Sequence, residues 1–251
     1  MVLRGVAPRT VFYAIGDVHG CLEKLLGLHI VIRTWHRDVH GTAPRRIIHL
    51  GNLIDRGPDS ALVVASVRSL SPESLCLRGS HEAMMEAGVS RGLAVNPHTP
   101  RTATARREGL LAFRHWSTQG GAETLASYDG REEAFASDRR WLAGLPTRID
   151  VPERGLVFAH AGIDPDTYPA DDPETQMWTR ALRFLDSARW TNPALDGVTV
   201  VHGHTPTQGS KPEISADGRR INVDTGACCG GPLSAAVLAQ GEPVRFLSSD
   251  R

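Results

Sequence analysis

The sequence predicts an α/β domain with a second sheet, and two features of the chain lead to this prediction. Over the first 90 residues, short apolar runs alternate with stretches whose apolar side chains recur at helical spacing. After Leu145-Pro146, short apolar runs separated by Gly, Pro and Asp turns indicate further strands. Several polar residues follow these runs directly, and open α/β sheets place their sites where strands end.

The first half of the chain shows three repeats of strand, loop and helix. The run at 10–15 is apolar and aromatic and stops at a glycine, which is typical of a buried strand that enters a loop. Pro58, Asp59 and Ser60 favour the start of the second helix. The expected elements are strands at 10–15, 46–50 and 74–77 and helical stretches at 22–35, 61–70 and 83–86, with a polar break at 37–44.

The second half is predicted to begin with a helical cover. Residues 88–124 are rich in Arg, Thr and His and lack a clean strand, so we expect helices and loops over one side of the substrate site. The expected strands of the second sheet are 156–159, 198–202, 221–223 and 235–239. We expect one domain over 1–251, with the helical cover at about 88–145.

Bulk composition excludes some classes of partner. The 251 residues are 41% hydrophobic, and 28 basic side chains balance 28 acidic ones. A formal net charge of zero gives no global attraction to duplex nucleic acid or to an anionic membrane. No apolar run reaches the ~20 residues of a membrane span, and the N-terminal residues lack signal-peptide features. We therefore expect a cytoplasmic protein with a local anion site.

The four cysteines do not have the spacing of a zinc site. Cys21 and Cys76 are isolated, whereas Cys228 and Cys229 are adjacent. Reduced, packed thiols are the default interpretation. A strained vicinal disulfide or a soft-metal ligand pair is the alternative for the adjacent cysteines.

Polar residues of similar kinds follow five of the expected strands. A carboxylate and an imidazole two residues apart, as in Asp17 and His19, are weak evidence alone, because a helix cap with a solvated histidine explains them equally well. Their recurrence at the other strand ends is hard to explain by chance. The further residues are Asn52, Asp55, Arg56, His81, Glu82, His160, His202 and His204.

These segments resemble, in order, the motifs of the calcineurin-like metallophosphoesterases, the family of serine/threonine protein phosphatases and symmetrical diadenosine tetraphosphatases. The family pattern GDxHG, GDxxDRG, GNHE, HAG and GHT stands here as GDVHG (16–20), GNLIDRG (51–57), GSHE (79–82), FAHAGI (158–163) and VHGHTP (201–206). The resemblance implies a phosphoesterase with two packed mixed β-sheets flanked by α-helices.

The resemblance also implies a two-metal site. Two divalent ions would share a water, lower its pKa and clamp the phosphoryl oxygens. Mn²⁺ is the first expectation for this mixed oxygen and nitrogen ligand set, which Fe, Zn or Mg also suit. The implied ligands are Asp17 and His19 for the first ion, His160, His204 and position 80 for the second, and position 52 as the bridge.

Four further residues have implied roles in handling phosphate and protons. Arg56 presents a planar fork to phosphate oxygens, and Arg180, in Met177-Trp178-Thr179-Arg180, resembles a second phosphate-binding arginine. An ordinary surface arginine is the alternative for Arg180. His81 is placed to protonate the leaving alkoxide, and Asp55 to orient that imidazole.

Two ligand positions depart from the family pattern. Asn52 stands where the family has a bridging aspartate, and Ser80 where it has an asparagine. An amide lacks the anionic oxygen that two cations share, and a short hydroxyl reaches less far. Three explanations remain open: an inactivated variant, a pseudophosphatase that binds phosphorylated ligands, or an enzyme that works with one tightly held ion.

The sequence indicates the type of reaction more specifically than it indicates the substrate. The segment GGAETLASYDG (120–130) is similar to one in bacterial protein phosphatases and favours a phosphorylated protein or peptide. Symmetrical cleavage of diadenosine tetraphosphate, a nucleotide phosphoester, is the alternative. Among other polar residues, a packed or second-layer role is expected for His202, and a buried carboxylate satisfied by backbone donors explains Asp224.

Overall fold

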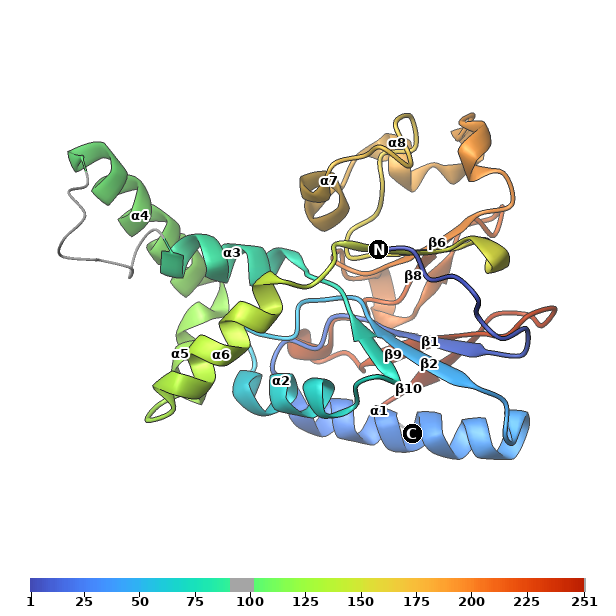
Figure 1. Ribbon diagram of the computed structural model, residues 1–251, viewed down its shortest axis with the longest axis horizontal. Coiled ribbons are helices and arrows are strands. Elements are labelled where there is room, and N and C mark those ends of the chain that lie inside the picture. The colour runs from blue at the N-terminus through green and yellow to red at the C-terminus, as the bar shows by residue number, and fades with distance from the viewer. Residues whose placement is uncertain (91–101, 251) are drawn as a thin grey trace.

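Two five-stranded mixed sheets form the centre of the computed structural model, which describes residues 1–90 and 102–250 (Figure 1). The first sheet has the order β10-β9-β1-β2-β3, with β1, β2 and β3 parallel and with β9 and β10 antiparallel to their neighbours. Its strands are β1 (Val11–Ile15), β2 (Arg45–His49), β3 (Ser74–Cys76), β9 (Ser234–Leu238) and β10 (Arg245–Ser248).

The second sheet has the order β4-β5-β6-β8-β7. Strands β5, β6 and β8 are parallel, whereas β4 and β7 pair antiparallel at the two edges. The strands are β4 (Arg148–Val151), β5 (Leu156–Ala159), β6 (Thr199–His202), β7 (Glu213–Ile214) and β8 (Arg220–Asn222). The expected architecture of two mixed sheets is therefore confirmed, although β4, β7 and β10 were not predicted.

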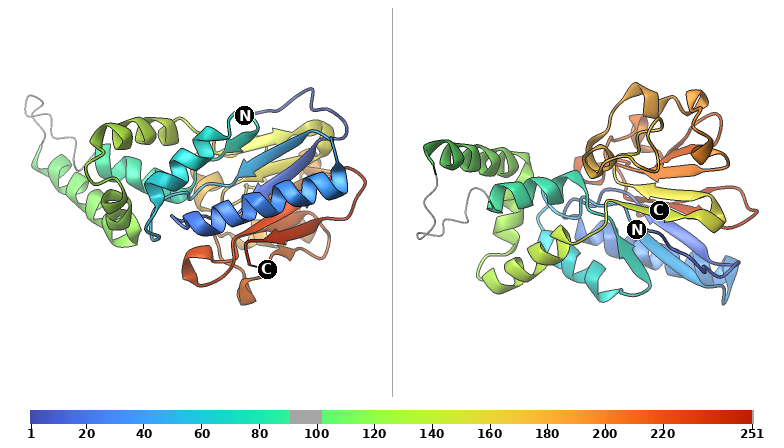
Figure 2. Two further views of the ribbon diagram at one scale, coloured as in Figure 1. Left: turned by 90° about the horizontal axis from the view of Figure 1, so that it is seen from below. Right: turned by 45° about the horizontal axis from the view of Figure 1, so that its top comes forward.

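Helices cover the outer faces of both sheets (Figures 1 and 2). Helices α1 and α2 lie under the first sheet, α7 and α8 lie above the second, and α3 to α6 extend to one side. The helices are α1 (Leu22–Trp35), α2 (Ser60–Ser69), α3 (Ser80–Gly88), α4 (Ala103–Trp116), α5 (Ala122–Ser127), α6 (Glu132–Ala143), α7 (Pro173–Trp178) and α8 (Leu182–Leu185).

Two sequence predictions, a polar break and a helical cover, agree with the structure to different extents. The break was placed too early, because the chain continues from α1 as a π-helical turn, His36–His40, and reverses only at Gly41, whose φ is 61°. In the cover region, α4, α5 and α6 lie where helices were expected. The part of that expectation covering 91–101 falls outside the described residues.

The two sheets are held together by apolar side chains from their facing sides. Phe12 of β1 and Phe158 of β5 are fully buried, and their ring centroids lie 5.8 Å apart. Removing such a ring typically costs about 3–5 kcal/mol of stability. Since β1 and β5 both lead into site loops, this core fixes the distance between the loops of one sheet and those of the other.

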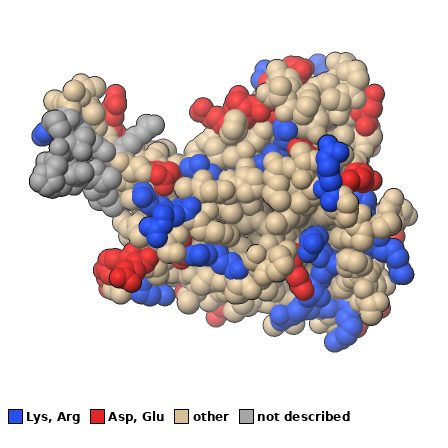
Figure 3. Space-filling model, viewed as in Figure 1, with Lys and Arg blue, Asp and Glu red and all other residues tan. Residues whose placement is uncertain are grey.

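The surface carries charges of both signs. On the face in Figure 3, clusters of Lys and Arg alternate with clusters of Asp and Glu, in keeping with the balanced composition. Within residues 1–90 and 102–250, no helix is both long enough and apolar enough to cross a bilayer.

Two buried histidines lie between α1 and the first sheet. The ring centroids of His29 and His49 are 5.4 Å apart, and the angle between the ring planes is 77°. His49 is 0% exposed, and neither of its ring nitrogens has a hydrogen-bond partner in the described part of the chain. Burial lowers the pKa of His29 to about 4 and that of His49 well below its usual range.

We expect these histidines to make the fold acid-sensitive. As the pH falls from about 6.5 towards 4, the unfolded chain takes up protons on both imidazoles while the folded chain does not. The free energy of unfolding should therefore fall by about 1.4 kcal/mol per pH unit for each histidine. Urea titrations at several pH values would measure this slope, and His49→Leu should make it shallower. The exposed His115→Gln is the control, and an unchanged slope in His49→Leu would contradict the expectation.

Candidate active site

The predicted site residues converge at one edge of the molecule, where the carboxyl ends of parallel strands from both sheets meet. Asp17 follows β1, Asn52 follows β2 and Ser80 follows β3 in the first sheet. His160 and His204 follow β5 and β6 in the second. Residues distant in sequence are thus brought together by topology, as the rule for open α/β sheets predicts.

The backbone is strained at this edge. Of six non-glycine residues with positive φ in the described ranges, five are predicted site residues, and left-handed backbone at such residues costs of order 1–3 kcal/mol each. They are His19 (φ 47°), Asn52 (52°), Asp55 (73°), Arg56 (70°) and His204 (70°). Strain concentrated in this way is typical of a functional site held by its surroundings.

His160 and His204 form one donor pair. His160 Nε2 lies 3.2 Å from His204 Nδ1. His160 Nδ1 donates to the Leu50 carbonyl at 2.8 Å, which leaves Nε2 with its lone pair facing the site. Burial lowers the pKa of His160 well below its usual range and that of His204 to about 4, with the Arg180 charge as a second cause for His204. Both rings are therefore neutral at pH 7, the form that binds metal.

Asp17 and His19 form the other donor pair. His19 Nδ1 donates to the Ile54 carbonyl at 2.9 Å, so its Nε2 lone pair faces Asp17 Oδ2, 3.9 Å away. Burial and the nearby Asp224 carboxylate raise the pKa of Asp17 well above its usual range. Gly203 permits this packing, because a Cβ there would lie 2.3 Å from Asp17 Oδ1. A cation between these donors would relieve the repulsion between the two carboxylates.

Asn52 does not fit the role of a shared metal ligand. Its Oδ1 accepts the backbone N–H of His81 at 2.9 Å, so its Nδ2 must point the other way. That Nδ2 donates to Asp17 Oδ2 at 2.9 Å and lies 3.5 Å from His19 Nε2. An amide N–H has no lone pair for a cation. A donor group thus stands where a bridge between two ions would need an oxygen.

Ser80 partly fits its predicted role. Its Oγ lies 3.3 Å from His160 Nε2 and 3.4 Å from His204 Nδ1, beside the donor pair. Over the two described ranges, no group of three or more His, Cys, Asp or Glu side chains has metal-binding geometry. Each donor pair thus supplies two donors, and positions 52 and 80 do not complete the ligand sets.

Arg56 lies at the open side of these residues. Its side chain is exposed, with Nη1 3.0 Å from His19 Nε2 and Nη2 3.1 Å from His81 Nε2. Its backbone N–H donates to the Gly120 carbonyl at 3.2 Å. The Arg56 residue is thus held both at its backbone and at its guanidinium, whose fork lies beside His19 and His81.

His81 and Asp55 form the predicted dyad. Asp55 is 0% exposed, and its Oδ2 lies 2.7 Å from His81 Nδ1. Sequence reasoning missed the residues that hold Asp55: Trp116 Nε1 donates to both carboxylate oxygens at 3.1 and 3.0 Å, and Thr124 Oγ1 donates at 2.6 Å. Thr124 lies in the segment singled out at 120–130, whereas nothing in the local sequence marks Trp116.

Glu82 is the other residue whose role was missed. Its buried carboxylate accepts backbone N–H groups of Asn52 and Gly79 at 2.9 and 2.8 Å through Oε2, and of Leu53 at 2.8 Å through Oε1. Its position next to His81 in the GSHE motif was the available signal. Glu82 therefore ties the loops after β2 and β3 together.

The remaining polar residues named from sequence have structural surroundings. His202 Nε2 accepts from Arg220 Nη1 at 3.0 Å, and the His202 ring packs against Phe184, so it is a packed histidine. Asp224 Oδ1 accepts the Gly226 N–H at 3.0 Å, and burial raises the pKa of Asp224 to about 6.

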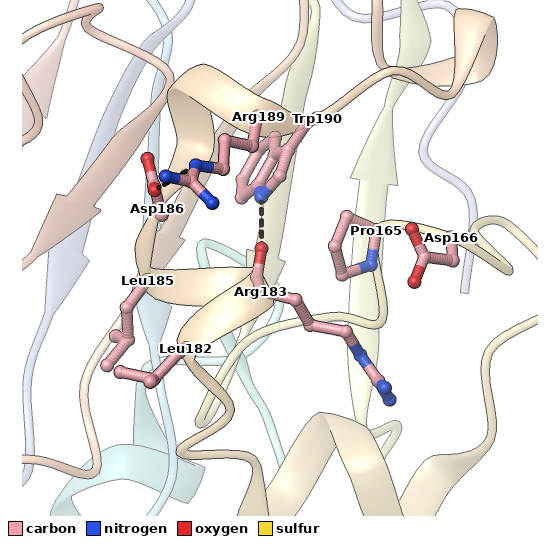
Figure 4. Close-up of a pocket in the computed structure, with 8 residues that line it drawn as sticks. All are labelled: Pro165, Asp166, Leu182, Arg183, Leu185, Asp186, Arg189 and Trp190. Carbon is pink, nitrogen blue, oxygen red and sulfur yellow. Dashed lines mark hydrogen bonds and ion pairs between the residues drawn. The ribbon is translucent and has the colours of Figure 1, made fainter.

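A cavity under α8 is separate from this site (Figure 4). It lies on the outer side of the second sheet, where Trp190 Nε1 donates to the Arg183 carbonyl and Arg189 pairs with Asp186. None of the predicted site residues lines it.

Comparison with known proteins agrees with this geometry. The family model described as calcineurin-like phosphoesterase matches residues 10–228. A bis(5'-nucleosyl)-tetraphosphatase PrpE [asymmetrical] from Halalkalibacterium halodurans is 27% identical over 89% of this chain and 88% of its own length. A symmetrical bis(5'-nucleosyl)-tetraphosphatase from Yersinia enterocolitica is 30% identical over 81% of this chain and 56% of its own length.

A solved structure supports the same fold. A protein serine/threonine phosphatase from Saccharomyces cerevisiae superposes with a TM-score of 0.56 at 14% identity, covering 98% of this chain and 82% of that one. With the family model matched over most of the residues, the chain belongs to the calcineurin-like phosphoesterase family of metallophosphoesterases.

Proposed function

We propose that this chain binds the phosphates of a nucleoside polyphosphate beside Arg56 and hydrolyses a phosphoester bond there with the help of divalent metal. The observation that carries the proposal is the position of Arg56. Its exposed guanidinium has one Nη atom against His19 and the other against His81. A planar fork in this place suits two oxygens of one phosphoryl group, next to the donors of the metal site.

The metal would be held by the two donor pairs, Asp17 with His19 and His160 with His204. A divalent ion held there would lower the pKa of a bound water and polarise a phosphoryl oxygen. The ligand set suits hard or borderline ions, among which we propose Mn²⁺. Asn52 adds neither charge nor an oxygen to this set, so we expect weak occupation and slow turnover.

Proton transfer to the leaving group falls to His81. Its Nδ1 faces Asp55 at 2.7 Å, so its Nε2 faces the side on which Arg56 lies. Asp55 has no solvent contact, and its carboxylate orients the His81 imidazole for proton transfer. We expect Arg180, whose charge acts on His204, to add a second phosphate contact.

The choice of a nucleotide rests on an aromatic side chain and on the relatives. Trp178, at the end of α7, is 37% exposed, and its ring centroid lies 6.1 Å from that of His204. An exposed indole beside the phosphate site offers a face on which a base can stack. The curated relatives reported above carry names that describe dinucleoside tetraphosphate cleavage.

The segment 120–130, whose sequence favoured a protein phosphatase, contacts Arg56 and Asp55 in the structure. The Gly120 carbonyl accepts from the Arg56 backbone, and the Thr124 hydroxyl donates to Asp55. These contacts serve the phosphate machinery whatever the substrate is. A phosphoserine peptide therefore remains the comparison substrate for the experiments below.

A second candidate function is phosphate-ester binding without turnover. The observation in its favour is the amide of Asn52, whose N–H donates to Asp17 at 2.9 Å. Arg56 and Asp55 are held by other residues, among them Gly120, Trp116 and Thr124, so we expect recognition of phosphate to persist without hydrolysis. Isothermal titration of diadenosine tetraphosphate combined with an assay for phosphate release separates the two candidates.

We expect the double variant Asn52→Asp/Ser80→Asn to gain metal and activity. The carboxylate supplies the shared anionic oxygen, and the longer amide reaches the His160 and His204 pair. Manganese affinity and kcat should each rise on the order of 100-fold or more, since even outer ligands change them by 10- to 100-fold. Metal analysis after gel filtration and turnover with added Mn²⁺ measure both, and the single variants assign each gain. Equal turnover of the wild-type chain and the double variant would contradict the expectation.

Trp178→Ala should affect nucleotide substrates selectively. Loss of base stacking should lower kcat/KM for diadenosine tetraphosphate on the order of tenfold, in the background of the double variant. Turnover of a phosphoserine peptide should be unchanged, because it presents no base. Trp178→Phe is the matched control and should keep most of the activity. Equal losses on both substrates would count against a nucleotide-stacking role.

A further inference from the structure

Two adjacent cysteines lie beside the proposed phosphate clamp. Cys228 and Cys229 occupy a short 3₁₀ turn between β8 and β9, and their sulfurs are 3.6 Å apart. Cys228 is half-buried, whereas Cys229 is exposed, and both are free thiols. Arg56 Nη1 donates to Cys228 Sγ at 3.8 Å. The pair is therefore open to small reagents and in contact with the group that we propose to bind phosphate.

The turn that carries the thiols is held in place by backbone contacts. Gly226 and Gly230 have φ of 73° and 89° on either side of it, a conformation that favours glycine. Lys24 Nζ donates to the carbonyls of Ala227 at 2.9 Å and Gly231 at 2.6 Å. The fold therefore fixes the backbone of the turn, on which the two sulfurs lie 3.6 Å apart.

That spacing suits chelation better than a disulfide. Two thiolates bound to one tetrahedral ion at about 2.3 Å lie roughly 3.7 Å apart, close to the 3.6 Å seen here. A disulfide usually joins Cα atoms about 4.4–6.8 Å apart, and neighbouring residues offer only about 3.8 Å, so a bridge would be strained.

We propose that Cys228 and Cys229 form a dithiol site for a soft, thiophilic metal ion or a trivalent arsenical, and that its occupation weakens phosphate binding by Arg56. The proposed effect on phosphate binding rests on the proposed function. Cys228 Sγ lies 3.8 Å from Arg56 Nη1, so a group bound to this sulfur stands within contact distance of the guanidinium. The fold thus couples a soft-ligand site to the phosphate clamp.

Phenylarsine oxide is a direct probe of such a pair. Each sulfur forms a bond to arsenic, and the two thiol protons leave with the arsenical oxygen as water, with no change of oxidation state. We expect the intact protein to gain one phenylarsine group by mass spectrometry. The adduct should survive excess monothiol and be removed by excess small dithiol. Cys229→Ser should form no stable adduct, and Cys21→Ser, a half-buried thiol outside the pair, should behave as wild type.

The coupling is measured by calorimetric titration with inorganic phosphate. Modification should weaken phosphate binding at least tenfold in the wild-type chain and leave Cys229→Ser unaffected by the same treatment. A stable adduct on Cys229→Ser, or its loss in Cys21→Ser, would overturn the dithiol site. Unchanged phosphate affinity in the modified chain would overturn the coupling. If the unmodified chain binds no phosphate, the proposed function has failed, while the mass of the adduct still decides the dithiol site.

Discussion

The buried carboxylate of Glu82 is the contact on which the rest of the site depends. It accepts three backbone N–H groups, from Asn52, Leu53 and Gly79, and so joins the loops that follow β2 and β3. The loop after β2 carries Asn52, Asp55 and Arg56 in left-handed backbone, each at a cost of order 1–3 kcal/mol. Hydrogen bonds to a charged group contribute about 1.5–3 kcal/mol each, enough to offset that strain. Without this anchor, neither the dyad nor the clamp would have a fixed position.

The same rigidity decides how Asn52 behaves. If the Asn52 amide were rotated by 180°, its N–H groups would face the backbone N–H of His81. Two buried hydrogen-bond donors would then face each other. The orientation that places Nδ2 against Asp17 is therefore imposed by the backbone. Compared with an aspartate, the amide thus places a hydrogen bond to Asp17 where a carboxylate oxygen would stand, and the remaining donors are left as two separate pairs.

The sequence predicted the parts of this protein that repeat a local pattern. Asp17, Asn52, Ser80, His160 and His204 each follow an apolar run, and parallel strands bring such positions to one edge. Residues such as Trp116 and Cys228, whose partners Asp55 and Arg56 lie 61 and 172 positions away, could not be predicted, because only the tertiary structure pairs them. Strands β4, β7 and β10 were missed because they are short edge strands whose polar and charged residues hide the alternation.

Binding and chemistry depend on different parts of this site. The position of Arg56 is set by Gly120 through its backbone and by His19, His81 and Cys228 around its guanidinium. Of these residues, His81 also donates its backbone N–H to the Asn52 side chain. In the proposed function, hydrolysis depends on the charge and reach of the side chains at positions 52 and 80. We therefore expect changes at these two positions to reduce turnover before they reduce phosphate recognition.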